Sequence, residues 1–187
     1  MDAALTATAA APAPRRGRRS IEERVALALP GALVRGTLRA YARLPPGSEL
    51  RRRFCKRAFA RGLEGSARGD HAFALMFYEP DIELRVVGEV VRALGVAGSY
   101  TGRDGYVEAW NDYTRDMGEL RVVPEQFIDL GDRIALRASL VGVGRSSGAE
   151  TSRALGYVCY FSKRGLIERL EGYWTWDEAL ASLRKQA

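Results

Sequence analysis

The sequence predicts an α+β fold, built on a β-sheet with helices packed against its apolar face. Two observations lead to this prediction. Strand-like segments follow one another between residues 121 and 174, and short turn signals separate them. A further strand and a helix with an aromatic stripe precede these segments, and such a sheet must bury at least one face. The segments are 121–130, 133–144, 150–162 and 166–174.

The N-terminal part of the chain reads as helical after an unstructured start. Residues 1–19 are mostly Ala, Thr, Pro and Arg without periodicity, which predicts a disordered tail. Ser20 and Glu23 have the spacing of a capping box, so a helix begins there. A second helical run ends at Pro45, because proline cannot continue a helix. We therefore assign residues 20–47 to a helical extension and residues 48–187 to the main domain.

The main domain is predicted to open with an arginine-rich helix. Ser48 caps this helix, its apolar stripe includes Leu50 and Phe54, and Gly65 marks its end. A short helix is expected over residues 71–78.

The first strand and the central helix come next. Pro80-Asp81 turns the chain into a strand over residues 82–87, and a connection with a helical turn at 89–94 follows. The central helix begins between residues 101 and 104, and Gly118 ends it. Helical spacing places four side chains on one stripe of this helix: Tyr106, Trp110, Tyr113 and Met117.

Composition and charge narrow the class of protein. The chain has 187 residues, of which 47% are hydrophobic and 28% charged, as in globular proteins. We expect neither a membrane-spanning helix nor a secretory signal, because no apolar run is long enough and the first arginines follow the Ala-rich stretch. Residues 1–61 hold 14 Lys/Arg against 4 Asp/Glu, whereas residues 62–187 hold 15 against 19. The positive charge therefore belongs to the N-terminal third.

No cofactor or metal site is predicted. Cys55 and Cys159 form no metal-binding spacing and are expected to be free thiols in the cytoplasm. His71 is the single histidine, so zinc or iron would lack ligands. Gly142 and Gly144 lie on a strand rather than before a helix, which argues against a phosphate-binding loop.

Several short motifs together resemble the SnoaL-like members of the nuclear transport factor 2-like superfamily. The resemblance covers about residues 50–182 and implies a cone-shaped half-barrel of curved antiparallel sheet, with helices over its mouth and a pocket inside. It also implies a homodimer through the outer sheet face. Family members include cyclases, isomerases and hydrolases, so the fold does not fix the function. The motifs are YEPDIEL at 78–84, GRDGYVEAW at 102–110, FIDLGDRI at 127–134 and KRGLIERLEGY at 163–173.

The resemblance also implies where a catalytic carboxylate would lie, and those positions hold none. The acid of the cyclases and epoxide hydrolases corresponds to Gly172, and that of ketosteroid isomerase corresponds to Val86. The Arg-x-Asp of the epoxide hydrolases corresponds to Arg137 and Ser139. These departures weigh against acid–base catalysis, since such enzymes use a buried carboxylate as the base.

Other residues are candidates for a site. Glu168 and Glu83 are strand carboxylates, and strict alternation places Glu168 on the same face as Gly172. Arg137 is a candidate for binding an anionic group, with an ion pair on the outer face as the alternative. Each glutamate could equally be a surface residue. The candidate ligand pocket comprises Tyr78, Trp110, Tyr113, Phe127, Arg137, Tyr157, Gly172 and Trp174, although aromatic residues also fill cores.

Three hypotheses follow. The first is a protein that binds a small apolar or polyketide-like molecule in the cone. The second is an acid–base enzyme of the same fold: an isomerase, cyclase or hydrolase. The third is a dimeric interaction module whose basic residues 20–61 lie peripherally on an anionic membrane surface, although the same residues would also suit a solvated helical cap. Nucleic acid is the least favoured partner.

Overall fold

The computed structural model describes residues 18–88, 97–115, 117–144 and 148–185. Its centre is one curved sheet in the order β2-β1-β6-β5-β4-β3. All neighbouring strands are antiparallel except β1 and β6, which run parallel, so the sheet is mixed rather than purely antiparallel. The strands are β1 (Tyr78–Val86), β2 (Ser99–Thr101), β3 (Met117–Asp129), β4 (Arg133–Gly144), β5 (Glu150–Phe161) and β6 (Ile167–Tyr173).

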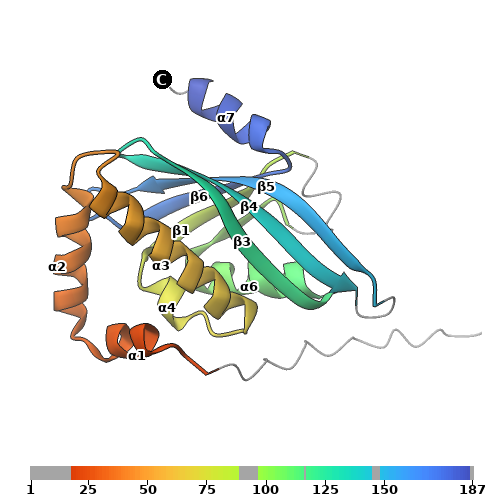
Figure 1. The fold of residues 1–187 in the computed structure, drawn as a ribbon, viewed down its shortest axis with the longest axis horizontal. Helices are drawn as coiled ribbons and strands as arrows, with labels where there is room; N and C mark the ends of the chain where they lie inside the picture. Colours follow the sequence, from red (N-terminus) through yellow and green to blue (C-terminus); the bar gives the residue numbers. More distant parts are fainter. Residues whose placement is uncertain (1–17, 89–96, 116, 145–147, 186–187) are drawn as a thin grey trace, which may run out of the picture.

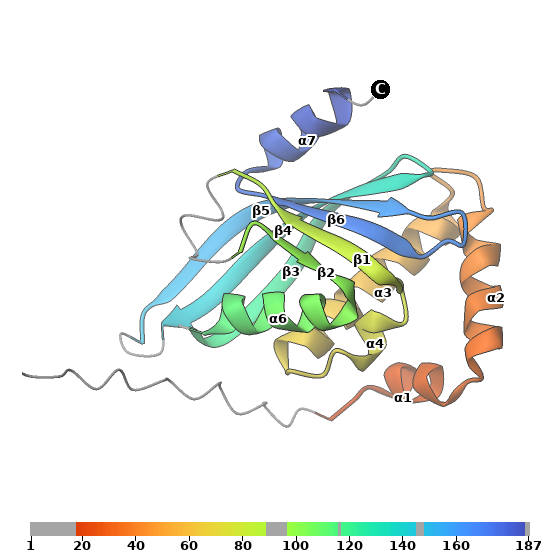
Figure 2. The same ribbon diagram turned by 180° about the vertical axis from the view of Figure 1, so that it is seen from behind.

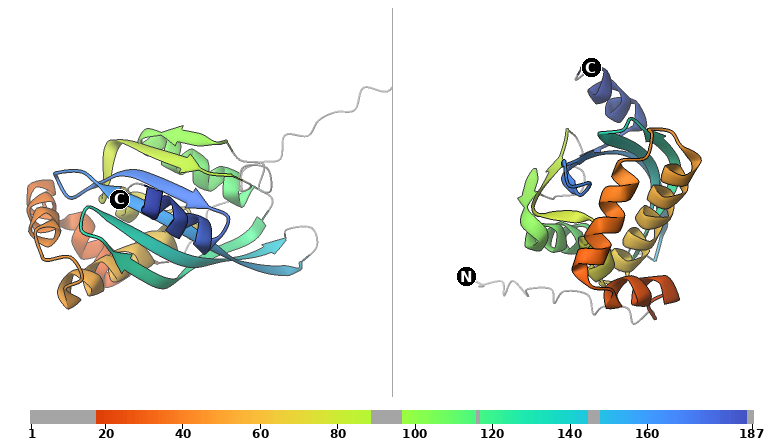
Figure 3. Two further views of the ribbon diagram at one scale, coloured as in Figure 1. Left: turned by 90° about the horizontal axis from the view of Figure 1, so that it is seen from above. Right: turned by 90° about the vertical axis from the view of Figure 1, so that its left-hand side faces the viewer.

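The helices divide between the two faces of this sheet. α3, α4 and α6 lie under the concave face, while α7 lies on the convex face (Figures 1 and 3). α2 stands at one end of the sheet, next to the end of the β5–β6 hairpin, and α1 lies beneath it (Figure 2). The helices are α1 (Ile21–Ala28), α2 (Gly31–Ala42), α3 (Glu49–Ala67), α4 (Ala72–Leu75), α6 (Gly102–Thr114) and α7 (Trp176–Lys185). The predicted cone with helices over its mouth is confirmed.

Alternation along the strands explains where the core lies. Ile82, Leu84 and Val86 of β1 are buried on the concave side, whereas Glu83 and Arg85 point to the other face. The side chains of Tyr106 and Trp110 from α6 pack against this concave face. A second, smaller cluster lies on the convex face, where Ala179 of α7 is fully buried beside Val158, Tyr160 and Tyr173.

The first strand differs from the prediction. Tyr78 pairs with Ile167, so β1 begins four residues earlier than expected and the preceding helix α4 ends at Leu75. Pro80 and Asp81 lie inside β1, where a register shift leaves both exposed instead of forming a turn between elements. The helical turn predicted at 89–94 lies outside the described residues.

Three other features also differ from the prediction. β2 was not predicted, and its three residues are held mainly by antiparallel pairing with β1. α6 ends at Thr114, and Met117 pairs with Gly144 as the first residue of β3 rather than continuing the helical stripe. Leu50, predicted on the apolar stripe of α3, is exposed.

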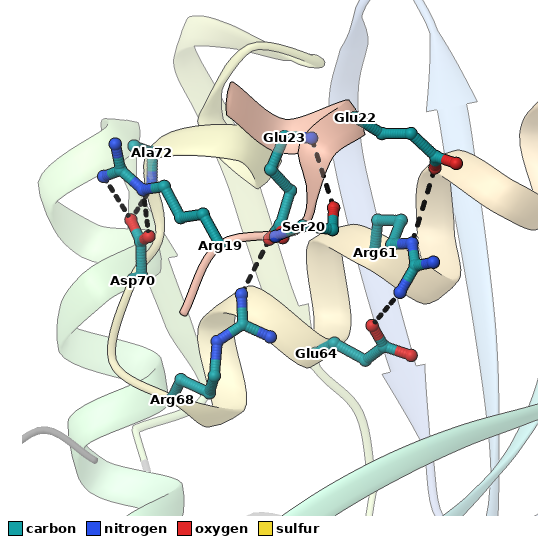
Figure 4. Close-up of polar contacts among 9 residues, drawn as sticks. All are labelled: Arg19, Ser20, Glu22, Glu23, Arg61, Glu64, Arg68, Asp70 and Ala72. Carbon is teal, nitrogen blue, oxygen red and sulfur yellow. Dashed lines mark hydrogen bonds and ion pairs between the residues drawn. The ribbon is translucent and has the colours of Figure 1, made fainter. Parts of the chain in front are cut away.

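Polar contacts attach α1 to α3 and to the loop before α4 (Figure 4). The Ser20–Glu23 capping box is present, and Glu23 also accepts a hydrogen bond from Arg68 at 2.7 Å while its side chain is only 2% exposed. Burial acts to raise the pKa of Glu23, but hydrogen bonds from Ser20 and Arg68 outweigh it and lower that pKa. Arg19 adds a pair to Asp70, with Nη2 2.9 Å from Oδ1. α1 is thus docked by charge pairs more than by apolar contact.

α7 covers part of the outer, convex face of the sheet. Gly156 allows the helix to approach, since a Cβ there would lie 2.6 Å from the Cβ of Ala179. Under this region Glu171 accepts hydrogen bonds from the hydroxyls of Tyr160 and Tyr173, at 3.0 and 2.7 Å. The part of the outer face near β5 is therefore covered by the chain itself. Among the described residues, no helix combines the length and hydropathy needed to span a bilayer.

Candidate functional site

Two adjoining cavities lie on the concave side of the sheet. The outer cavity, of about 770 Å³, is enclosed by α2, α3 and the turns at the ends of the β3–β4 and β5–β6 hairpins. The inner cavity, of about 70 Å³, lies deeper in the cone between α6 and strands β1, β4, β5 and β6. Phe59, Leu63 and Tyr78 line both cavities. These three side chains form the partition between them.

The inner cavity is built by strand register. Val86 pairs with Gly172, and Gly172 pairs on its other side with Tyr157, so the three positions lie side by side on adjacent strands. A Cβ at Gly172 would lie 3.6 Å from the Tyr157 ring, which shows that the ring lies over the glycine. α6 supplies the opposite wall through Tyr113 and other aromatic side chains of its predicted stripe.

The described lining of the inner cavity includes one charged residue, Arg85, whose guanidinium pairs with Glu83 on the opposite face of the sheet. The same described lining contains no Asp or Glu side chain. Burial raises the pKa values of Tyr157, Tyr113 and the Cys159 thiol, so all three groups keep their protons at neutral pH. Next to it, the Tyr106 hydroxyl lies 2.8 Å from Ser66 Oγ. The wall can therefore offer hydroxyl hydrogen bonds to a ligand, but it holds no ionised base.

The outer cavity is lined by one face of α3 and by the end of α2. Phe54, Ala58 and Gly62 recur every fourth residue on α3, which gives it an inward stripe of apolar and small side chains. Tyr41 of α2 stacks on Phe54, with ring centroids 3.8 Å apart and an interplanar angle of 7°. Leu38 of α2 is 5% exposed. α2 therefore supplies a wall of the outer cavity.

Arg51 fixes the base of the outer cavity. Its guanidinium Nε lies 2.9 Å from Asp129 Oδ2, and the two side chains are 4% and 3% exposed. It also donates hydrogen bonds to the carbonyls of Ala42, Leu44 and Gly131. One buried cation thus joins the end of α2, the start of α3 and the β3–β4 turn.

The mouth of the outer cavity carries several further cations. Arg39, Arg43, Lys163 and Arg164 contribute to its lining. Arg164 is paired with Glu79, with Nη2 2.8 Å from Oε2. The lining contains a single carboxylate, that of Asp132, and this pairs with Arg133 at 3.1 Å.

Five of the eight predicted pocket residues line the inner cavity: Tyr78, Trp110, Tyr113, Tyr157 and Gly172. Phe127 and Trp174 pack against the same core but line neither cavity. Arg137 points to the convex face, where its Nε lies 3.1 Å from Glu125 Oε2. The alternative of an ion pair on the outer face therefore describes Arg137. Its partner is Glu125 of β3, and not Glu168 or Glu171 of β6.

The two candidate catalytic glutamates also lie outside the cavities. Glu83 makes a double hydrogen bond with Arg85, at 2.7 and 2.9 Å, on the face away from the core. Glu168 is exposed and borders a polar surface cleft with Glu79 and Asp81. Leu170 and Gly172 share one face, as strand alternation predicted, and both line the inner cavity, but Glu168 lies beyond its edge. The structure does not bring either carboxylate to the cavity wall.

The residues of the outer cavity were missed because no local pattern identifies them. The signal that was available is the pair of apolar faces on the second and third helices, around Leu38 and Phe54. The contact between these two faces could not be read from the sequence.

His71 packs edge-on to Tyr106, with ring centroids 5.8 Å apart, and burial lowers the pKa of His71. No group of three or more metal-ligating side chains occurs in the described part of the chain.

Comparisons with known proteins bear on the fold. No protein-family model matches the chain, and no curated protein does. Several solved structures do match, at low identity. An NTF2-like protein of unknown function from Burkholderia pseudomallei superposes with a TM-score of 0.55 and 19% identity, covering 67% of this chain and 93% of its own. TerC, co-crystallised with polyporic acid, superposes with a TM-score of 0.55 and 21% identity, and the match covers 69% of this chain and 96% of its own.

A SnoaL-like protein of unknown function from Burkholderia thailandensis gives a TM-score of 0.51 with 15% identity, covering 70% of this chain and 99% of its own. These structures are matched over almost their whole length, whereas about a third of this chain has no counterpart in them. At such identities the likeness concerns the fold. The chain has the cone-shaped fold of the NTF2-like and SnoaL-like proteins, as its motifs implied.

Proposed function

We propose that this protein binds a small, largely apolar molecule in the outer cavity, with one end reaching the inner cavity. The observation that carries the proposal is that Phe59, Leu63 and Tyr78 line both cavities, so a ligand in the outer cavity needs to displace only these side chains to reach the inner one. A volume of about 770 Å³ lies within the range of ligand pockets, roughly 300–1,000 Å³. TerC, a protein with the same fold, was crystallised with a small molecule, which supports the proposal.

The described walls favour binding over acid–base catalysis. Val86 and Gly172, where the resemblance implies a catalytic acid, line the inner cavity and carry no carboxylate. Glu83 and Glu168 would need to leave the opposite face or the surface to act there. The alternative is an isomerase, cyclase or hydrolase that polarises its substrate through the hydroxyls of Tyr78 or Tyr157. Such an enzyme would show turnover of the bound molecule.

Ligand binding can be tested with the neutral fluorescent probe N-phenyl-1-naphthylamine. Ala58 lines the outer cavity, so Ala58→Trp should fill it and reduce the affinity for the probe at least tenfold. Ala40→Trp is the matched control, because Ala40 is exposed on α2 and lines neither cavity. Native mass spectrometry of the purified chain would show whether a molecule is retained. Equal probe binding by both variants, or no binding by the unmodified protein, would contradict the proposal.

A second candidate function rests on the outer surface of α1. Ile21 and Val25 are 71% and 54% exposed and lie one turn apart, and Leu29 continues the row. Arg24 and Arg35 are exposed nearby. An apolar row flanked by arginines is the pattern of a helix that lies on an anionic membrane surface.

Vesicle co-sedimentation tests this candidate. Full-length protein should sediment with vesicles containing anionic phosphatidylglycerol and not with phosphatidylcholine alone. Ile21→Gln/Val25→Gln should abolish this sedimentation. Val123→Gln/Ile128→Gln, which changes two exposed apolar residues on β3, should leave it unchanged. Equal sedimentation of the two double variants would exclude α1 as the contact.

We also propose that α1 and α2 are additions to the shared fold, since about a third of the chain lies outside the matched structures. Their role would be to close the outer cavity. Homodimerisation and a cytoplasmic location stay predictions. A dimer through the outer sheet face would have to accommodate α7, which covers the region of β5.

A further inference from the structure

The mouth of the outer cavity carries positive charge without internal partners. Arg39 and Arg43 lie one turn apart at the end of α2, and Lys163 lies in the turn between β5 and β6. Within the described residues, none of these three has a hydrogen bond or ion pair through its side chain. Several other arginines near the N-terminus are paired within the chain, for example Arg57 with Glu22 and Arg68 with Glu23, but these lie away from the opening.

The elements that carry these cations are in contact. A Cβ at Gly165 would lie 2.8 Å from the Cβ of Ala42 and 3.2 Å from the carbonyl oxygen of Leu38. The β5–β6 turn is therefore pressed against the end of α2, as Figure 2 shows. This contact places the turn that carries Lys163 beside the end of α2, which Arg43 caps.

The remaining charged groups of the opening are already neutralised. Arg51 pairs with Asp129 and Arg164 with Glu79, while Asp132 pairs with Arg133. The three free cations therefore set the sign of the potential at the entrance. The interior immediately behind them is lined by aromatic rings such as Phe54, Phe77 and Phe161.

We propose that the ligand is an amphipathic acid, whose apolar body occupies the outer cavity and whose carboxylate lies among Arg39, Arg43 and Lys163. This inference rests on the proposed binding function and adds a ligand class to it. Arginine suits the role because its planar guanidinium donates two parallel hydrogen bonds to a carboxylate. An apolar site with a few placed polar groups gives both affinity and orientation.

Displacement of N-phenyl-1-naphthylamine by decanoate and by 1-decanol tests the proposal. The two competitors have the same chain length and differ in the charged head group. At low salt we expect decanoate to displace the probe at about tenfold lower concentration, the effect of a few partly exposed ion pairs. Raising the salt concentration should reduce this preference, because it screens exposed charges.

The variant Arg39→Gln/Arg43→Gln/Lys163→Gln should remove the preference for decanoate, so that decanoate and 1-decanol displace the probe at similar concentrations. The matched control is Arg24→Gln/Arg35→Gln/Lys56→Gln, which removes the same charge from exposed positions outside the outer cavity and should keep the preference. A preference that survives in the first variant, or is lost equally in both, would overturn the inference.

The same experiment separates this inference from the proposed function. If the neutral probe and decanol bind but decanoate is not preferred, the cavity binds apolar molecules and the carboxylate site is wrong. If neither the probe nor either competitor binds, the binding function itself fails. A fall in the urea midpoint of the first variant would indicate misfolding, and in that event single substitutions of Lys163 and Arg43 would carry the comparison.

Discussion

The inner and outer cavities differ in how the sequence specifies them. The inner wall follows from strand alternation and from one helical stripe, so Tyr78, Trp110, Tyr113, Tyr157 and Gly172 can be named from the sequence alone. The outer wall depends on the docking of α2 against α3 and two hairpin turns, and no local period encodes that docking. The end of α2 therefore helps to form a cavity although no local sequence pattern marks it.

The largest effect on the outer cavity is expected from removing Arg51, the buried cation that joins α2, α3 and the β3–β4 turn. Arg51→Met would leave Asp129 buried without its ion-pair partner and free three carbonyls. Loss of one partner of a buried pair costs about 3–5 kcal/mol, so the free energy of unfolding in urea should fall by that amount. Probe binding in the outer cavity should be lost as well.

Arg52→Met is the control for this prediction. Arg52 is the next residue along α3, and it pairs with Glu49 at the exposed surface. Its replacement should change the stability by less than about 1 kcal/mol. Similar losses for the two variants would show that Arg51 does not hold the outer cavity together.

A substitution at Gly165 should displace α2 while leaving the inner cavity in place. Gly165 has φ +77°, and an added Cβ would meet the Cβ of Ala42 at 2.8 Å. Backbone strain and this clash together predict a loss of about 2–4 kcal/mol for Gly165→Ala. Gly47→Ala has the same backbone problem at φ +75° but no atom within 4 Å, so it should cost about 1–2 kcal/mol.

The comparison of these two alanine variants isolates the contact with α2. Only Gly165→Ala should weaken binding of the fluorescent probe. If Gly47→Ala weakens binding equally, the effect comes from the loop backbone and not from the position of α2.

The docking of α1 should depend on pH through Glu23. The pKa of this carboxyl is lowered in the folded state, so its contribution is complete above its unfolded pKa and is lost as the pH falls through the folded pKa. Glu23→Gln should reduce stability by about 1–3 kcal/mol at pH 7, because it leaves Arg68 without its carboxylate. In urea titrations the difference from the unmodified protein should shrink in acid. A difference that stays constant down to pH 3 would contradict this account.

The sequence was informative for most elements that depend on a short period or a capping pattern, although Met117 and Leu50 left their predicted helical stripes. The capping box at Ser20 is present, and Ser48 caps α3 by accepting a hydrogen bond from the backbone N–H of Arg51. The prediction failed at Pro80, where a bulged strand replaces the expected turn because pairing of Tyr78 with Ile167 extends β1 backwards. Strand pairing is a long-range interaction, and a local proline signal could not reveal it.

The candidate site was likewise predictable where it depends on strand alternation, and not where it depends on long-range contacts. Alternation placed Glu168 and Gly172 on one face, and only the family resemblance favoured that face as the cavity side. Neither could say where the cavity ends, and so Glu168 was considered although it lies at the surface. For Arg137 the ion pair with Glu125 depends on a register shift in β3 between Pro124 and Gln126. Such a shift changes which face a residue occupies. Arg51 and Arg57 of α3 likewise find partners far away in the sequence, Asp129 and Glu22.

The two cysteines give the finest comparison, since Cys55 lines the outer cavity and Cys159 lines the inner one. Burial raises the pKa of Cys55 from 9.0 to about 11, so at pH 8 its thiolate fraction is about a hundredfold below that of a free thiol with the ordinary value. Its alkylation by iodoacetamide should be slow, should accelerate about tenfold per pH unit, and should slow further when probe fills the outer cavity. Cys159 is fully buried and should react only on unfolding. Cys55→Ser should therefore remove the pH-dependent phase of alkylation and keep the phase that follows unfolding. A single alkylation rate shared by both thiols would show instead that the partition between the cavities opens freely.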